Sequence, residues 1–304
     1  MKVGLACERI SFGDSEQLNG FWCPPAGGLA DGAVPIGVVV VHGWAGDPWG
    51  NYYTDPLLNA LHTDKVGVFR AERGGSHVLA FRGPQLCGAS MQTIESELED
   101  TTAAVRAARE YGRLGHVVLV GFSIGATLAA MEAVRDGAGV DGVVLISPTL
   151  MHNFMARIDE RHADLLGVAT ELAEQGCPNA MVVHNHRAFG MPIAAAAYAS
   201  LSKADIAPHL VRLNELGVPL LVLHGSEDPA IHLSYGVRDS ATGEWGGGSE
   251  ALRTFMQVHA PRARVVELVG AGHDPAGEHA ELAAQEIRAF VGGAALGGAK
   301  SFVT

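Results

Sequence analysis

Charged and aromatic residues are scarce in this sequence of 304 residues. Only 18% of the residues are charged and 6% are aromatic, whereas 48% are hydrophobic, a composition typical of globular rather than disordered proteins. Basic residues are outnumbered, and the formal net charge of −12 argues against nucleic acid or an anionic membrane as a partner. No hydrophobic run approaches the roughly 20 residues of a membrane span. The hydrophobic run among the first residues is also too short for a signal peptide.

Cysteine is scarce too, and its four copies are widely spaced, at Cys7, Cys23, Cys87 and Cys177. No two of them form a Cys-x-x-Cys pair, which argues against a metal site and against a disulfide framework. The sequence therefore predicts a protein of a reducing compartment, the cytoplasm, with no metal and no cofactor.

The stretch from Val117 to Ala130 is the most informative part of the chain. It opens with a run of mainly β-branched residues typical of a buried strand, turns at Gly-Phe-Ser-Ile-Gly, and continues in residues that favour a helix. Gly121 and Gly125 would let strand and helix approach closely, with Ser123 strained and exposed at the helix N-terminus. A serine before a helix can also be a simple N-cap, but the flanking strand and helix favour a nucleophile.

Strand-like and helix-like segments alternate along most of the chain. Besides a hairpin over 8–23, we expect strands over 36–41, 66–70, 140–147, 218–223 and 264–269, and helices over 53–61, 94–108, 210–216, 251–259 and 280–290. This alternation predicts an α/β fold with a mostly parallel central sheet and helices on both faces, built as one domain over residues 1–304. The Gly/Ala-rich end, 292–304, is expected to fray.

The alternation stops between residues 149 and 207. This stretch contains helical spacing from Met155 to Leu172, a short apolar patch at 181–183 and an alanine-rich helix starting at Pro192, with no strong strand. We interpret it as a mainly helical cap insertion over the sheet.

A serine hydroxyl needs a general base, an acid that orients the base, and donors for the oxyanion. In open α/β sheets such groups gather at the carboxyl ends of strands. Strand 218–223 is followed by His-Gly-Ser-Glu-Asp-Pro, which contains Asp228 and an alternative acid, Glu227. Strand 264–269 is followed by Gly-Ala-Gly-His-Asp, which contains His273. The order along the chain is therefore serine, acid, histidine.

With His42-Gly43-Trp44 after strand 36–41, these motifs resemble the α/β-hydrolase superfamily over about residues 8–290. The resemblance implies an α/β-hydrolase fold and a site of five residues: Ser123 as nucleophile, His273 as base, Asp228 as acid, and the backbone N–H groups of Trp44 and Ile124 as oxyanion hole. The turn at residues 71–76 departs from the family's Asp-x-Arg-Gly-x-Gly-x-Ser, because it lacks the aspartate and is one residue shorter.

Other polar residues near these strand ends are expected to serve structure. We expect His42 and His224 to bond neighbouring backbone, and Asp274 to be a loop residue. His184-Asn185-His186 has no third ligand nearby and is expected to be a polar loop rather than a metal site.

The resemblance implies a serine hydrolase that cleaves a carboxylic ester or thioester of a small molecule through an acyl-enzyme on Ser123. Two alternatives stay open: an acyltransferase that uses the same triad with an alcohol or amine acceptor, and a hydrolase-fold lyase or binding protein with a repurposed triad. The acyl group does not follow from the fold.

The connection over residues 232–249 is longer than usual and contains Tyr235 and Trp245 among several glycines. It begins just after Asp228, so we expect it to form a lid that packs Trp245 toward the cap. Tyr235 and Trp245 are therefore predicted to bind substrate.

Overall fold

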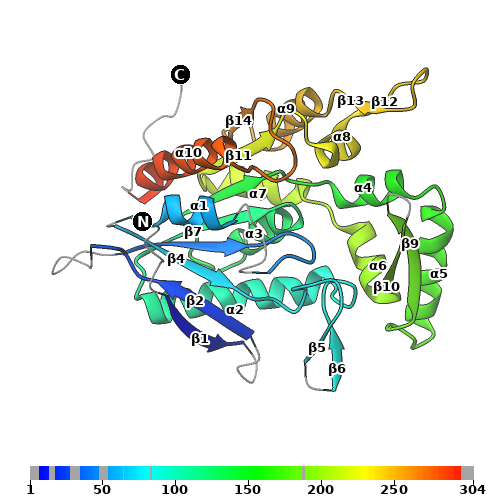
Figure 1. Cartoon of the computed structure of the whole chain (residues 1–304), viewed down its shortest axis with the longest axis horizontal. Coiled ribbons are helices and arrows are strands. Elements are labelled where there is room, and N and C mark those ends of the chain that lie inside the picture. The colour runs from blue at the N-terminus through cyan, green and yellow to red at the C-terminus, as the bar shows by residue number, and fades with distance from the viewer. Residues whose placement is uncertain are drawn as a thin grey trace.

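The computed structural model describes residues 7–13, 18–27, 35–47, 54–63, 65–82, 84–186 and 189–295. An eight-stranded sheet forms its centre, in the order β1-β2-β4-β3-β7-β8-β11-β14 (Figure 1). The β1–β2 hairpin pairs antiparallel to β4 at one edge, and all the other pairs are parallel. The strands are β1 (Glu8–Phe12), β2 (Leu18–Cys23), β3 (Ile36–Val41), β4 (Val66–Ala71), β7 (His116–Phe122), β8 (Gly142–Ile146), β11 (Leu220–Gly225) and β14 (Arg264–Leu268).

Helices cover both faces of this sheet, as the alternation predicted. One face packs against α1 (Thr54–Leu61) and α10 (Glu278–Ala295). The other packs against α2 (Ile94–Gly112), α3 (Ile124–Ala133), α7 (Ala207–Leu216) and α9 (Gly248–His259). The short helix α8 (Pro229–Tyr235) follows β11 directly.

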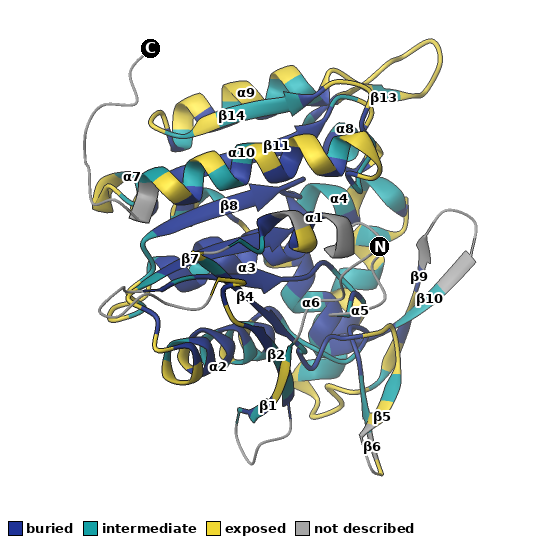
Figure 2. Cartoon of the chain, turned by 60° about the vertical axis from the view of Figure 1, so that its left-hand side comes forward, coloured by how far each residue is buried: buried dark blue, intermediate teal, exposed yellow. Residues whose placement is uncertain are grey.

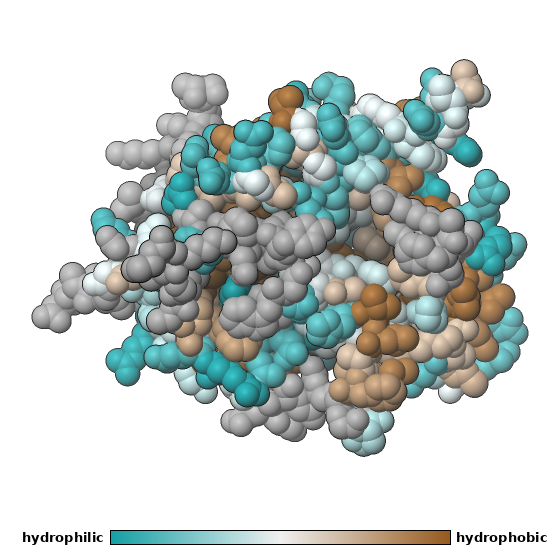
Figure 3. Space-filling model, viewed as in Figure 1, coloured by the Kyte–Doolittle hydropathy of each residue, from teal (hydrophilic) through white to brown (hydrophobic). Residues whose placement is uncertain are grey.

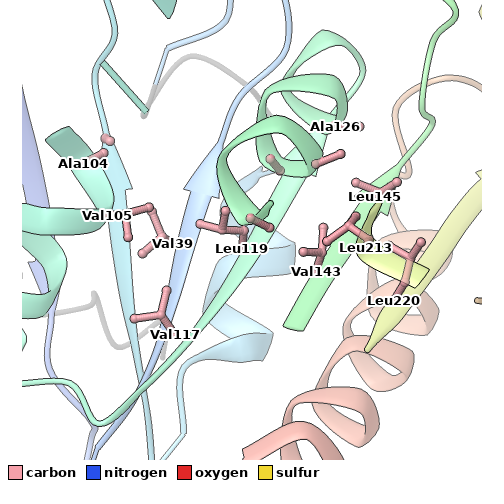
Figure 4. Packing of buried hydrophobic residues seen from close by; sticks show 14 of the residues in the cluster. Val39, Ala104, Val105, Val117, Leu119, Ala126, Val143, Leu145, Leu213 and Leu220 are labelled. Carbon is pink, nitrogen blue, oxygen red and sulfur yellow. The ribbon is translucent and has the colours of Figure 1, made fainter. Parts of the chain in front are cut away.

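The central strands are buried on both sides, which explains why they read as continuous hydrophobic runs (Figure 2). In β3, Val39 faces the helices of one side while Val38 and Val40 face α1 and α10. In β7, Leu119 joins Val39 in the first of these clusters (Figure 4). Because side chains alternate between the two sides of a strand, one run of residues contributes to both hydrophobic cores.

The segment 149–207, called the cap segment below, was only partly predicted. The one expected helix is two, α4 (Met151–Ile158) and α5 (His162–Glu174), and the alanine-rich helix α6 (Ala195–Lys203) starts three residues later than expected. The absence of a strong strand was wrong, because β9 (Met181–His186) and β10 (Phe189–Ala194) form an antiparallel hairpin. Its signal is the alternation of exposed Met181 and Val183 with buried Val182 and His184.

A disulfide joins Cys7 to Cys23, which corrects the expectation from cysteine spacing. The register of the first hairpin pairs Glu8 with Trp22, so the two cysteines that flank this pair lie opposite each other, with Cα atoms 4.2 Å apart. The two cysteines are 16 residues apart in sequence, so their contact across the strands does not follow from spacing alone. Because two of the four cysteines are paired, the cysteines no longer support a reducing compartment.

The last helix is longer than predicted. Helix α10 continues through residues 292–295, beyond the expected end at residue 290, and Val291 is buried against the sheet. Fraying of the end from residue 292 stays a prediction. The rest of the expected frayed end, 296–304, lies outside the described residues.

Two small hairpins extend from the body: β5 (Ala80–Arg82) with β6 (Gln85–Cys87), and β12 (Val237–Arg238) with β13 (Trp245–Gly246). On the face in Figure 3, hydrophobic residues gather over the β5–β6 hairpin and the cap segment, where Phe81 and Val183 are exposed. In the part of the chain that the structure describes, no helix is long and hydrophobic enough to span a membrane.

Candidate active site

Ser123 lies between β7 and α3 with a strained backbone, at φ 55° and ψ −120°. A side chain at Gly121 would collide with the Gly125 carbonyl, and one at Gly125 with the carbonyls of Val41 and His42. The two glycines are therefore required by close approach, as the sequence indicated. The Ser123 side chain makes no capping bond to α3, so its hydroxyl does not serve as an N-cap.

His273 and Asp228 are hydrogen-bonded to each other. The Nδ1 atom of His273 lies 2.9 Å from Oδ2 and 3.0 Å from Oδ1 of Asp228. The carboxylate is fully buried at the N-terminus of α8, where its Oδ1 also accepts the backbone N–H groups of Ala230 (2.8 Å) and Ile231 (3.2 Å). Glu227, the alternative acid, is exposed.

Asp228 stays ionised in this setting. Burial alone would raise the pKa of its carboxyl group, but the hydrogen bond and charge of His273, with the two backbone N–H bonds, hold that pKa below its usual value. A buried anion thus faces one nitrogen of the imidazole and fixes which nitrogen carries the proton.

A cavity of about 460 Å³ opens beside these residues. Ser123 and His273 line it together with Trp44, and hydrophobic side chains of the cap segment form much of the rest: Met151, Phe154, Met155, Ile158, Met191, Ile193 and Leu201. The structure therefore brings the predicted nucleophile, base and one oxyanion residue to the same space, under a hydrophobic roof.

The backbone N–H groups predicted for the oxyanion hole belong to Trp44 and Ile124. Ile124 is the first residue of α3 and directly follows Ser123 in the sequence. Because it opens the helix, its N–H has no acceptor within α3. Trp44 follows β3, and its neighbour Gly43 lies so close to Ser123 that a side chain at this glycine would come within 3.3 Å of the Ser123 Cβ.

The loop after β8 contributes residues that the sequence analysis missed. The Ser123 hydroxyl hydrogen-bonds the hydroxyl of buried Thr149 (3.4 Å), and Ser147 Oγ donates to the carbonyl of His273 (2.9 Å). Ser147 has a left-handed backbone at φ 48°. Both residues lie at the carboxyl end of the predicted strand 140–147, so the rule that polar groups gather at such ends could have found them.

Four other polar residues lie at or near the places expected for them. His42 bonds the Gly43 carbonyl (2.9 Å) and His224 the Gly225 carbonyl (3.4 Å), so both contact neighbouring backbone as predicted. Asp274 is in a loop but also lines the cavity, and burial raises the pKa of its carboxyl group. His184 belongs to β9 rather than to a loop and lines the cavity as well.

Tyr235 and Trp245 lie outside the cavity wall. Tyr235 packs its ring on Phe255, 5.3 Å between centroids. Trp245 lies under the guanidinium of Arg157, 4.3 Å from the ring centroid, and Arg157 belongs to α4 of the cap segment. Their predicted part in substrate binding stays a prediction, and for Trp245 it would act through α4.

Among the described residues, no group of three or more His, Cys, Asp or Glu side chains could hold a metal ion.

Comparison with known proteins identifies the same kind of fold. A family model described as "Alpha/beta hydrolase family" matches residues 38–286. No protein of curated function matches the sequence. Among solved structures, the chain is similar to Est1E from Butyrivibrio proteoclasticus (16% identity, TM-score 0.63, covering 92% of this chain and 95% of that one). It is also similar to a highly thermostable carboxyl esterase from Bacillus coagulans (15%, 0.65, 95% and 99%) and a thermophilic esterase from Thermogutta terrifontis (18%, 0.55, 95% and 99%). At these identities the likeness concerns the fold alone.

Proposed function

This chain belongs to the alpha/beta hydrolase family, and from that membership we propose that it is a serine hydrolase that cleaves a carboxylic ester or thioester. The observation that carries the proposal is the strained Ser123 in one cavity with His273, which is bonded in turn to buried Asp228. A strained backbone at a cavity wall is typical of a residue held for chemistry rather than for stability.

The reaction would proceed through an acyl-enzyme. His273 takes the proton of Ser123 as Oγ attacks the acyl carbon, and the backbone N–H groups of Trp44 and Ile124 donate to the oxyanion that forms. His273 then gives the proton to the departing alcohol or thiol. A water molecule, deprotonated by the same imidazole, attacks the acyl carbon and releases the acid and free Ser123. Asp228 stabilises the imidazolium at both stages.

The hydrophobic roof favours an apolar acyl group. The cap segment contributes three methionines to the wall, and methionine side chains adapt to ligands of different shape. Est1E, which has a similar fold, has been solved with ferulic acid bound, an aromatic acid. We therefore propose that residues 149–207 are an insertion in a single domain that shapes an acyl pocket.

A panel of p-nitrophenyl esters and acyl thioesters of rising chain length tests this function. We expect hydrolysis that depends on chain length, and a single mass increase on reaction with a fluorophosphonate, located at Ser123 by peptide mapping. Running the panel with and without an added alcohol would separate hydrolysis from acyl transfer. Labelling at another serine, with Ser123 unmodified, would contradict the proposal.

Enlarging a cavity residue should shorten the preferred acyl chain. Met191 of β10 lines the cavity, so Met191→Trp should lower turnover of the longest esters by about tenfold or more relative to the shortest. Met181→Trp is the matched control, since Met181 lies on the partner strand β9 and is exposed. An equal loss at every chain length in Met191→Trp would argue against an acyl pocket at this wall.

The predicted lid would act through the contact between Trp245 and Arg157 of α4. Arg157 donates to the carbonyls of Leu233 (2.6 Å) and Gly236 (3.1 Å), and its guanidinium stacks on the Trp245 ring. Trp245→Ala removes only a stacking contact worth about 1 kcal/mol, so thermal stability should hardly change. KM or acyl preference should shift a few-fold, because α4 lines the cavity. Val237→Ala on the partner strand is the control, and kinetics identical to wild type across the panel would refute the lid.

A further inference from the structure

Behind Trp44 lies a buried polar network that the proposed mechanism does not use. Its centre is Arg73, in the turn whose sequence departs from the family pattern, and only 2% of this residue is exposed. The Arg73 Nη2 group donates to the carbonyl of His42 (2.6 Å) and reaches that of Gly43 (3.4 Å). Arg73 therefore binds two consecutive carbonyls of the oxyanion loop, defined here as residues 42–46.

We propose that Arg73 is a positioning residue that holds the Gly43–Trp44 peptide so that the Trp44 N–H faces the substrate. The proposal rests on the proposed function, because that assigns this N–H to the oxyanion. The Gly43 carbonyl and the Trp44 N–H belong to one planar trans peptide, so they point in opposite directions. Donors that bind the carbonyl from behind therefore fix the direction of the N–H and also polarise it as a donor.

His42 and Ser76 complete the support from behind the loop. Burial, reinforced by the Arg73 charge, holds the pKa of His42 well below its usual value, so the ring is neutral. The Nδ1 atom of this ring lies within hydrogen-bond distance of both the Gly43 carbonyl (2.9 Å) and Arg73 Nη2 (3.0 Å), and its Nε2 lies 3.2 Å from the Ser76 hydroxyl. Ser76 Oγ accepts the backbone N–H of Arg73 (3.2 Å), and a β-bridge pairs Ser76 with Ala45, which has φ 55°.

Helix α2 anchors the network from the other side. The Arg73 Nη1 group forms a buried ion pair with Glu97, and the Gly74 N–H donates to Asp100 (2.6 Å). A side chain at Gly75 would collide with the Glu97 carboxylate, which would then have to move from its present position. A small buried space is lined by Arg73, Glu97 and Trp44, which places the ion pair directly behind the oxyanion loop.

Two variants test the proposal. Removing Arg73 alone would leave Glu97 buried without its partner, so the first variant is Arg73→Met with Glu97→Met, which replaces the ion pair by apolar side chains. The second is Arg73→Lys, which keeps a charge beside Glu97 but lacks the forked guanidinium that reaches the carbonyls as well. Arg253→Met, which breaks the exposed pair with Glu267, is the control.

The readout is a matched pair of inhibitors: an alkyl trifluoromethyl ketone and the corresponding secondary alcohol. Ser123 Oγ adds to the ketone carbon, its proton goes to His273, and the resulting oxyanion needs the Trp44 and Ile124 N–H groups. The alcohol fills the same cavity without forming this adduct. Both variants should lose roughly 10–100-fold in kcat and in ketone affinity, as a misplaced oxyanion donor predicts, with KM and alcohol affinity within about threefold of wild type.

Folded variants that keep the wild-type preference for ketone over alcohol would overturn the role of Arg73 while leaving the proposed function intact. Equal losses of ketone and alcohol affinity would also overturn it, since they indicate a general change of the cavity. A wild-type protein that binds ketone and alcohol equally would instead overturn the proposed function, and the role of Arg73 with it.

Discussion

Replacing Ser123 with alanine should reduce ester turnover to near background while the protein stays folded. If Ser123 is the nucleophile, the loss in kcat should be on the order of 10⁵ to 10⁶, because the triad acts as a unit. The side chain makes no capping bond to α3, and alanine can occupy the same backbone at the same conformational cost. Turnover across the ester panel, with thermal unfolding as the check on folding, measures both parts of this result.

Ser123→Gly separates the strain of the turn from its chemistry. Glycine adopts a positive φ without the steric cost that Ser123 bears at φ 55°, so this variant should be equally inactive but more stable than Ser123→Ala. The expected gain is about 1–3 kcal/mol, the usual cost of a strained backbone conformation. Equal stability of the two variants would mean that the turn stores no strain, and turnover close to that of wild type in either would mean that another group attacks the substrate.

Part of the turn at Ser123 could be predicted from its own segment. A side chain at Gly125 would collide with distant residues, Val41 and His42, but one at Gly121 would collide with the helix that starts in the motif itself, so this requirement is local. The same holds for the alternating buried strands, where Val38 and Val39 face opposite cores whatever the remainder of the chain does. A pattern of period two needs no long-range information.

The features that sequence reasoning missed depend on contacts between distant residues. Cys7 and Cys23 face each other only once the hairpin register is known. Thr149 meets Ser123 because β7 and β8 are neighbours in the sheet, and no spacing between residues 123 and 149 encodes that distance.

The network behind Trp44 is the clearest case of this limit. The turn at Arg73 departs from the family pattern because it lacks the aspartate within its own segment. Its acidic partners are Glu97 and Asp100 of α2, a helix that follows the turn only after β5 and β6. Whether a turn of different sequence keeps its geometry depends on such partners, and they are visible only in three dimensions.

Asp228→Asn should lower kcat by about 10⁴ with little change in KM, the loss expected when the base is held in the wrong tautomer. The amide can keep one oxygen toward the backbone N–H groups of Ala230 and Ile231, which turns its NH₂ toward His273 Nδ1. That nitrogen must then accept a hydrogen bond, so the ring proton moves to Nε2, the atom that has to take the proton of Ser123. Glu227→Gln, at the exposed neighbouring carboxyl group, should leave the rate unchanged.

The same variant should show a pH-dependent loss of stability. The folded pKa of Asp228 lies below the ordinary aspartate value of 3.8, so its ionised form stabilises the protein above about pH 4, and this contribution is lost as the pH falls through the lower folded value. Urea unfolding should therefore show a larger difference between wild type and Asp228→Asn at pH 7 than at pH 3. A crippling effect of Glu227→Gln together with a mild effect of Asp228→Asn would show that the acid is the other carboxyl group. A stability difference that grows toward acid pH would instead mean that the Asp228 carboxylate is not held ionised by His273 and the helix N-terminus.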